Sequence, residues 1–154
     1  MIHFLIIGSG VREAFIAKKL TEDSNYYNKY IKNNDIYTKN YDYTLKITCI
    51  GLNKNPILCE LCSNIFIISN YSIQKIDDIY NSSDIFKSLD FVIIGPENPL
   101  EIGLADYFER KLIPCLGPLK KYARLETSKG YCRDFLNKNN LGQYLPKYKC
   151  IKKN

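Results

Sequence analysis

The stretch "IHFLIIGSGVREAFIAKKL" at residues 2–20 predicts a strand, a glycine turn and a helix in direct succession. Residues 2–7 are apolar except for His3, and this run stops at Gly8, which is typical of a short buried strand. Residues 11–20 carry apolar side chains at helical spacing, which is typical of a helix with one buried face. The first twenty residues therefore indicate one strand–turn–helix unit of an α/β protein.

The same alternation continues along the chain and predicts the fold class. We expect further strands at 46–51, 64–69, 90–95 and 113–117, and helices at 73–89, 99–112 and 127–139. The end of the chain would begin a further strand or form a linker. Short apolar strands that alternate with amphipathic helices predict an α/β fold, with an open, mostly parallel, Rossmann-like sheet covered by helices on both faces. Ligands of such sheets bind beyond the carboxyl ends of the strands.

The length of 154 residues predicts a single core that needs neither metal nor disulfide for its stability. We expect the α/β domain to occupy residues 1–118, and a helix and linker to occupy residues 119–154. Residues 21–43 are dense in Asn, Tyr and Lys, and they read as a surface insertion or a long ragged helix end.

Composition favours a soluble, cytoplasmic protein. No stretch reaches the roughly 20 apolar residues of a membrane span, and the first residues lack the basic segment of a secretory signal. The net charge of +6 comes from basic residues scattered along the chain, so nucleic-acid binding is not favoured. The six cysteines are expected to be reduced thiols. Cys59 and Cys62 form a lone C-x-x-C, which we interpret as two thiols in a loop or at a helix end rather than a metal or redox site.

The motif "GSGVRE" at residues 8–13 is not a dinucleotide fingerprint, because the third glycine would fall at Glu13, and it is not a P-loop. Its glycines free backbone N–H groups, the helix start adds partial positive charge, and Arg12 could bind a phosphate through two hydrogen bonds. The alternative is a plain turn in which Arg12 is solvated.

Two further motifs have the same double interpretation. In "GPENPL" at 95–100, Glu97 at the end of a strand could accept hydrogen bonds from two sugar hydroxyls, or it could simply complement a helix dipole. Lys129 stands near a predicted helix start, where a cation is unfavourable. A bound anion would explain it, and an exposed lysine is the alternative.

Together, "LIIGSGVREAF", "FVIIGPENPL" and "LGPLKKYARLETSKGYCRDFL" resemble, in this order and spacing, the N-terminal domain of phosphoribosylamine–glycine ligase, also called glycinamide ribonucleotide synthetase. The resemblance covers most of the chain and is weakest across residues 21–89. This family belongs to the ATP-grasp superfamily of ligases. It joins 5-phosphoribosylamine to glycine with the use of ATP, a step of purine biosynthesis.

The resemblance also implies site residues and ligands. The first glycine loop would hold the ribose phosphate, the second motif would lie close to the ribosyl group, and one lysine would reach the ATP phosphates. ATP and Mg²⁺ belong to the full-length family and are not expected to bind well to this chain alone, because the ATP-grasp domain that supplies most of the nucleotide-binding pocket and the metal carboxylates lies beyond this sequence. We expect no catalytic residue and no metal site in the chain itself. The implied substrate-binding residues are Gly8, Ser9, Gly10, Arg12, Glu13, Gly95, Pro96 and Glu97, and the implied ATP-binding residue is Lys129.

The sequence departs from the family pattern, which is close to G-N-G-G-R-E-H-A, at Ser9, Val11 and Ala14. The leading hypothesis is therefore a ligase N-terminal domain that is inactive alone and works with an ATP-grasp domain in the same or another chain. The alternative is a stand-alone binding or scaffold protein that keeps the fold without the chemistry. A nicotinamide-dependent oxidoreductase is disfavoured, because no acidic residue follows the strand at 46–51.

Overall fold

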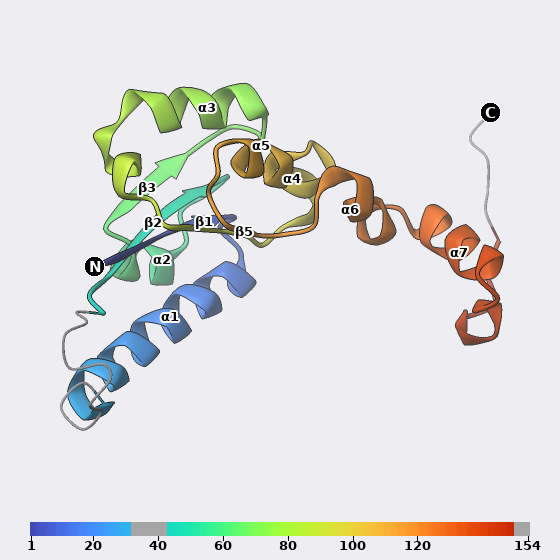
Figure 1. Ribbon diagram of the computed structural model, residues 1–154, viewed down its shortest axis with the longest axis horizontal. Helices are drawn as coiled ribbons and strands as arrows, with labels where there is room; N and C mark the ends of the chain where they lie inside the picture. Colours follow the sequence, from blue (N-terminus) through green and yellow to red (C-terminus); the bar gives the residue numbers. More distant parts are fainter. Residues whose placement is uncertain (32–42, 150–154) are drawn as a thin grey trace.

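The computed structural model describes residues 1–31 and 43–149, and within them it shows a five-stranded parallel sheet with helices on both faces (Figure 1). The spatial order of the strands is β3-β2-β1-β4-β5, and each strand is parallel to its neighbours. This confirms the α/β fold class expected from the sequence. The strands are β1 (Ile2–Ile7), β2 (Leu45–Gly51), β3 (Asn64–Ile67), β4 (Phe91–Ile94) and β5 (Cys115–Leu116).

The register of the sheet brings the ends of its central strands to one edge. Ile7 of β1 aligns with Ile50 of β2 on one side and with Ile94 of β4 on the other. The chain passes from β1 to β2 and β3 in one direction, then crosses back so that β4 lies beside β1. The crevice at this reversal, between the loops after β1 and β4, is where parallel sheets of this kind bind ligands.

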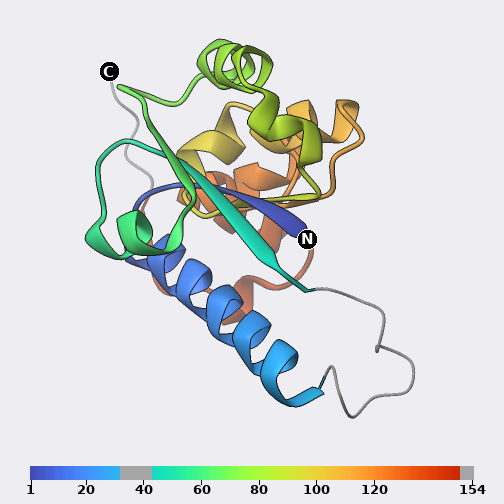
Figure 2. The same ribbon diagram turned by 90° about the vertical axis from the view of Figure 1, so that its left-hand side faces the viewer.

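One face of the sheet is covered by α1 (Val11–Tyr26) and α2 (Pro56–Leu61), as Figure 2 shows. Ala14 and Ala17 of α1 are buried against this face together with Leu58 of α2. No Gly or Pro interrupts residues 11–31, so α1 continues beyond the predicted end at residue 20 and passes into a π-helical turn, Tyr27–Ile31. The expected insertion at 21–43 thus begins as a helix end, and its residues 32–42 lie outside the described residues.

The other face carries the larger core, under α3 (Ile73–Ser82), α4 (Glu97–Glu101) and α5 (Leu104–Arg110). The helix expected over 73–89 stops at Ser83, whose backbone is extended and whose Oγ accepts a hydrogen bond from the N–H of Ile85 in a short 3₁₀ turn, Asp84–Ser88. The helix expected over 99–112 is divided at Gly103, whose φ of +89° is left-handed. Both corrections arise from local backbone breaks inside regions of continuous helical spacing.

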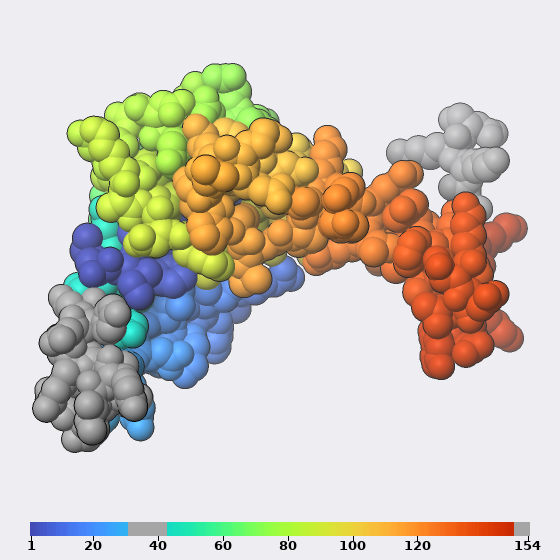
Figure 3. Space-filling view, in the orientation of Figure 1, coloured from blue at the N-terminus to red at the C-terminus, as the bar shows by residue number. Residues whose placement is uncertain are grey.

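Two helices follow β5, where the sequence predicted one. The structure has α6 (Lys120–Thr127) and α7 (Lys129–Lys138), separated by Ser128, which has an extended backbone and caps α7 through the N–H of Tyr131. The described residues after α7 form a 3₁₀ turn, Gly142–Tyr144, rather than the strand that was one of the two expectations. Figures 1 and 3 show that α7 projects away from the sheet, and none of its residues is buried.

The described part of the chain contains no helix with the length and apolar character needed to cross a membrane.

Candidate functional site

Arg12 connects the glycine motif at residues 8–13 to the motif at residues 95–100. Its Nη1 donates a hydrogen bond of 2.5 Å to the carbonyl of Gly95, and its Nη2 lies 3.7 Å from Oε1 of Glu97. The loop after β1 and the loop after β4 are therefore side by side at the carboxyl edge of the sheet. The side chains of Arg12 and Glu97 remain about half exposed, which leaves both accessible to a ligand.

Glu13 lies beneath the two loops rather than at their surface. It is only 4% exposed, and its Oε2 accepts a 2.6 Å hydrogen bond from the N–H of Gly10. A Cβ atom placed on Gly95 would lie 1.8 Å from Oε1 of Glu13, and one placed on Gly8 would lie 2.7 Å from its Cδ. These two glycines therefore make room for the buried carboxyl group of Glu13. In the sequence, Glu13 stands where a dinucleotide fingerprint has its third glycine.

Gly8 is also required by the backbone, since its φ of +123° is one that other residues rarely adopt. Val11 is different, because it is the first residue of α1, has a helical backbone and is 74% exposed. The valine that stands where the family pattern has glycine is thus compatible with the observed path of the loop.

Ser9 ties the first loop to the loop after β2. Its Oγ donates to Oδ1 of Asn53 at 2.8 Å and accepts from the N–H groups of Leu52 and Asn53 at 3.2 and 3.3 Å. Nδ2 of Asn55 donates to the carbonyls of Ser9 and Gly10, both at 3.3 Å. Sequence reasoning missed Asn53 and Asn55. The signal for Asn55 was its position before Pro56, because Asn as N-cap with Pro at the first helical position marks a helix start.

The thiol of Cys49 supports the same loop from inside the core. Its Sγ donates a hydrogen bond of 3.2 Å to the carbonyl of Gly8. The neighbouring Cys62 thiol, together with burial, raises the pKa of the Cys49 thiol, so it stays protonated and remains a donor. Cys62 is half-buried at the end of α2, as expected, whereas Cys59 is exposed within that helix. Among the described residues no group of three His, Cys, Asp or Glu side chains is placed to hold a metal ion.

The start of α1 is the position at which the sequence predicts an anion site. Gly10 is its N-cap and has no side chain to accept from the N–H groups of the first turn, while the carboxyl group of Glu13 in that turn accepts from the N–H of Gly10 itself. Beside it lies a groove of about 550 Å³, a size that suits a small ligand. The groove runs between α1, the ends of β4 and β5, and α6, and its lining includes Arg12, Ile16, Ile93, Leu116, Pro118 and Glu126.

Lys129 is not brought to these loops. It is exposed at the first position of α7, and α7 projects away from the sheet (Figure 1). The structure thus gathers the residues of the two glycine motifs at one edge and leaves the predicted ATP-binding lysine on a separate helix.

Comparisons with known proteins identify the family of this chain. The family model described as "Phosphoribosylglycinamide synthetase, N domain" matches residues 2–126. A phosphoribosylamine–glycine ligase from Pyrococcus furiosus is 27% identical over 141 residues, which are 92% of this chain and 27% of that protein. One from Methanocella arvoryzae is 32% identical over 145 residues, covering 94% of this chain and 28% of the relative. A bifunctional purine biosynthetic protein from Dictyostelium discoideum is 35% identical over 139 residues, covering 90% of this chain and 14% of that protein.

Among solved structures, N5-carboxyaminoimidazole ribonucleotide synthetase from Thermotoga maritima matches with a TM-score of 0.59 at 14% identity. The match covers 99% of this chain and 34% of the synthetase, and it supports the fold alone. The chain spans about a quarter of the length of the two ligases named above.

Proposed function

Because the chain belongs to the phosphoribosylglycinamide synthetase N-domain family, we propose that it forms the substrate-binding domain of a phosphoribosylamine–glycine ligase. The observation that carries this proposal is the junction of Arg12 with Gly95 and Glu97 at the carboxyl edge of the sheet. That junction joins a cationic side chain in the first turn of α1 to a carboxylate on the neighbouring loop. A ribose phosphate needs the same two kinds of partner.

In the proposed complex the phosphate lies at the start of α1, where the first-turn N–H groups and Arg12 meet it. The ribosyl hydroxyls lie toward Glu97, which accepts their hydrogen bonds. The ion pair between Arg12 and Glu97 is partly exposed and 3.7 Å long, so it contributes little stability by itself and is readily exchanged for contacts with a ligand. Ser9 and Glu13 fix the loop from its two sides and hold its backbone in place.

The rest of the reaction requires a further domain. In this proposal an ATP-grasp polypeptide supplies most of the nucleotide site and the carboxylates for Mg²⁺, and Lys129 reaches the ATP phosphates from the projecting helix α7. The position of Lys129 away from the substrate loops suits such a role, because the two ligands would then approach from different sides.

An NMR titration of ribose 5-phosphate into the chain tests the substrate site. We expect a dissociation constant in the millimolar range, about 4 kcal/mol of binding free energy, with shifts at residues 8–13 and 95–97. Arg12→Ala should nearly abolish binding, because one charge-assisted hydrogen bond contributes roughly 1.5–3 kcal/mol. Val11→Gly should tighten binding or leave it unchanged. Arg110→Ala, which removes an exposed cation at the end of α5, is the matched control and should bind like the wild type.

One observation favours a second candidate, the non-catalytic binding or scaffold protein. The hydroxyl of Ser9 already accepts from the N–H groups of Leu52 and Asn53, so these two donors are not free for a phosphate. The titration separates the two candidates. An Arg12→Ala protein that binds equally well, or shifts that avoid residues 8–13, would make the loop a structural turn and favour the second candidate.

A further inference from the structure

Three cysteines gather on the α1 side of the sheet, beneath the loop after β1. Cys49 of β2 belongs to the buried apolar cluster on this side and is only 1% exposed. Cys62 packs against the same cluster and is half-buried at the end of α2, three residues after the exposed Cys59. The two cysteines of the C-x-x-C sequence therefore have a third thiol beside them, which a neighbouring strand contributes.

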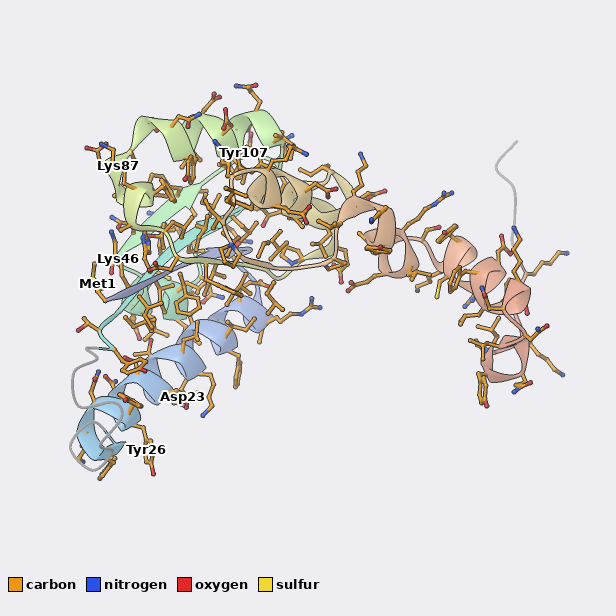
Figure 4. All side chains as sticks on the ribbon, viewed as in Figure 1. Met1, Asp23, Tyr26, Lys46, Lys87 and Tyr107 are labelled. Atoms are coloured by element: carbon orange, nitrogen blue, oxygen red, sulfur yellow. The ribbon has the colours of Figure 1, made fainter. Side chains whose placement is uncertain are left out.

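The path of the chain explains why Cys62 lies next to Cys49. β2 runs past Lys46, which Figure 4 labels, toward the carboxyl edge, so Cys49 lies in the half of this strand nearer the loop after β1. The chain enters β3 beside β2, where the N–H of Ser63 donates to the carbonyl of Ile47 at 2.8 Å. Cys62 directly precedes this contact, and its side chain packs on the face of β2 where Cys49 is buried.

Cys49 also connects this thiol cluster to the loop after β1. Its Sγ donates a hydrogen bond to the carbonyl of Gly8, the residue whose left-handed backbone turns the chain out of β1. The core around Cys49 is closely packed, so its sulfur cannot form a new bond without a change in the contacts that it already makes. A chemical change at Cys49 is therefore transmitted to the backbone of Gly8.

The two neighbouring thiols differ in reactivity. The interaction with Cys62, followed by burial, raises the pKa of Cys49, whereas the interaction with Cys49 lowers the pKa of Cys62. Cys62 is also the more exposed of the two. Because the thiolate is the nucleophile in thiol–disulfide exchange, Cys62 is the thiol that reacts first with an oxidant from solution.

We propose that Cys49 and Cys62 form a reversible disulfide when a low-molecular-weight disulfide such as oxidised glutathione is the oxidant, and that this bond releases the carbonyl of Gly8. The Cys62 thiolate attacks one sulfur of glutathione disulfide, forms a mixed disulfide and expels one glutathione thiolate. The sulfur of Cys49 then attacks the sulfur of Cys62 and expels the second thiolate. The two protein thiols lose two electrons, and their two protons pass to the two glutathione thiolates.

The second step is aided by the first. Once Cys62 is part of an uncharged mixed disulfide, its negative charge no longer raises the pKa of Cys49. In the product the sulfur of Cys49 carries no hydrogen, so it no longer donates to Gly8. The disulfide itself does not depend on the proposed function. Its effect on ligand binding does, because the loop after β1 is the proposed phosphate site, and the oxidised chain should bind ribose 5-phosphate more weakly than the reduced chain.

The test places the 154-residue chain in glutathione buffers of increasing oxidised fraction, then unfolds it with an alkylating agent and identifies linked peptides by mass spectrometry. The wild type should form a Cys49–Cys62 link that dithiothreitol reverses. The NMR signal of the Ser9 amide, whose nitrogen is bonded to the carbonyl carbon of residue 8, should shift as the link forms. Cys62→Ala should show neither the link nor the shift. Cys59→Ala keeps both thiols and should behave like the wild type, as should Cys132→Ala, which removes a half-buried thiol on the projecting helix α7.

Four outcomes would overturn the disulfide proposal. These are a Cys49 thiol that stays reduced in every buffer, a Cys59–Cys62 link in its place, a mixed disulfide that persists at Cys62, or a Cys49–Cys62 link that leaves the Ser9 signal unmoved. Titration of ribose 5-phosphate into the reduced and oxidised chains separates this proposal from the proposed function. A link that forms and shifts Ser9 in a chain that does not bind ribose 5-phosphate would count against the phosphate site alone.

Discussion

The side chain of Glu13 is ionisable, yet it is buried and packs between the loop after β1 and the loop after β4. Its carboxyl group lies against Gly8 and Gly95, and its hydrogen bond to the N–H of Gly10 closes the turn before α1. Glu13→Ala should therefore lower the free energy of unfolding by about 1–3 kcal/mol, because it removes the acceptor of the Gly10 N–H and leaves a void where the buried carboxyl group lay between the loops. Urea denaturation of the purified chain measures this change.

Glu22→Ala provides the control for the Glu13 variant, since Glu22 lies on the same helix but is exposed and forms a surface ion pair with Lys18 at 3.9 Å. Glu22→Ala should change the free energy of unfolding by no more than about 0.5 kcal/mol. Glu13→Gln keeps the shape and one acceptor oxygen, so it should be less destabilising than Glu13→Ala. Equal effects of Glu13→Ala and Glu22→Ala would show that the buried carboxyl group does not hold the loops together.

His3 is the single histidine of the chain and is fully buried in β1, away from the candidate site. Its Nε2 lies 2.8 Å from Oγ1 of Thr48 and its Nδ1 lies 3.2 Å from Oγ of Ser88. Burial, and then the charge of Lys46, lower the pKa of His3 below the usual 6.5, despite the opposing effect of Asp90.

The lowered pKa of His3 predicts a loss of stability in mild acid. As the pH falls below 6.5 the unfolded chain takes up the proton before the folded chain does, so the free energy of unfolding decreases until the folded chain is protonated as well. The loss amounts to at most about 1.4 kcal/mol for each unit by which the pKa is lowered. Chemical denaturation at several pH values should show this slope in the wild type and a smaller one in His3→Gln. Equal slopes would assign the acid sensitivity to other groups.

At the scale of elements, the strands were the most predictable feature. Runs such as "IHFLII" and "DFVIIG" are bounded by glycine, and the strands β1 and β4 lie where these runs predicted them. The juxtaposition of the two glycine motifs also followed from the sequence, because parallel strands bring their carboxyl ends to one edge. The joining contact was not predictable, since it depends on which carbonyl Arg12 reaches once the sheet has formed.

Helix boundaries were predicted less well, for reasons visible in single residues. α2 was missed because it is only six residues long, too short to show a periodic pattern. The break at Ser83 was missed because serine is compatible with a helix, and here its side chain instead caps the next turn. Ser128 separates α6 from α7 in the same way. Glu13 was read as a ligand residue because its burial depends on three glycines from two separate loops.

At the scale of the whole molecule, the described residues form a sheet with a well-packed core, but the elements at one edge of the sheet leave apolar side chains uncovered. The core is closed on both faces around β1 and β2, whereas β5, α6 and α7 carry exposed apolar residues. The loops proposed to bind the substrate lie on the closed part, and the residue proposed to reach ATP lies on the open part. This division is what a domain needs when it positions one substrate and shares the second with a neighbour.

The same division predicts that the 154-residue chain alone does not make glycinamide ribonucleotide. Catalysis of phosphoryl transfer consists mostly of positioning and charge neutralisation around the transferred group, and no cluster of acidic residues in the described structure could hold the metal that this requires. The chain incubated with ATP, Mg²⁺, glycine and 5-phosphoribosylamine should therefore form no product above background by mass spectrometry, while the full-length Pyrococcus furiosus relative serves as the positive control. Phosphate release that depends on both glycine and phosphoribosylamine would contradict this argument and would place the complete chemistry within this single domain.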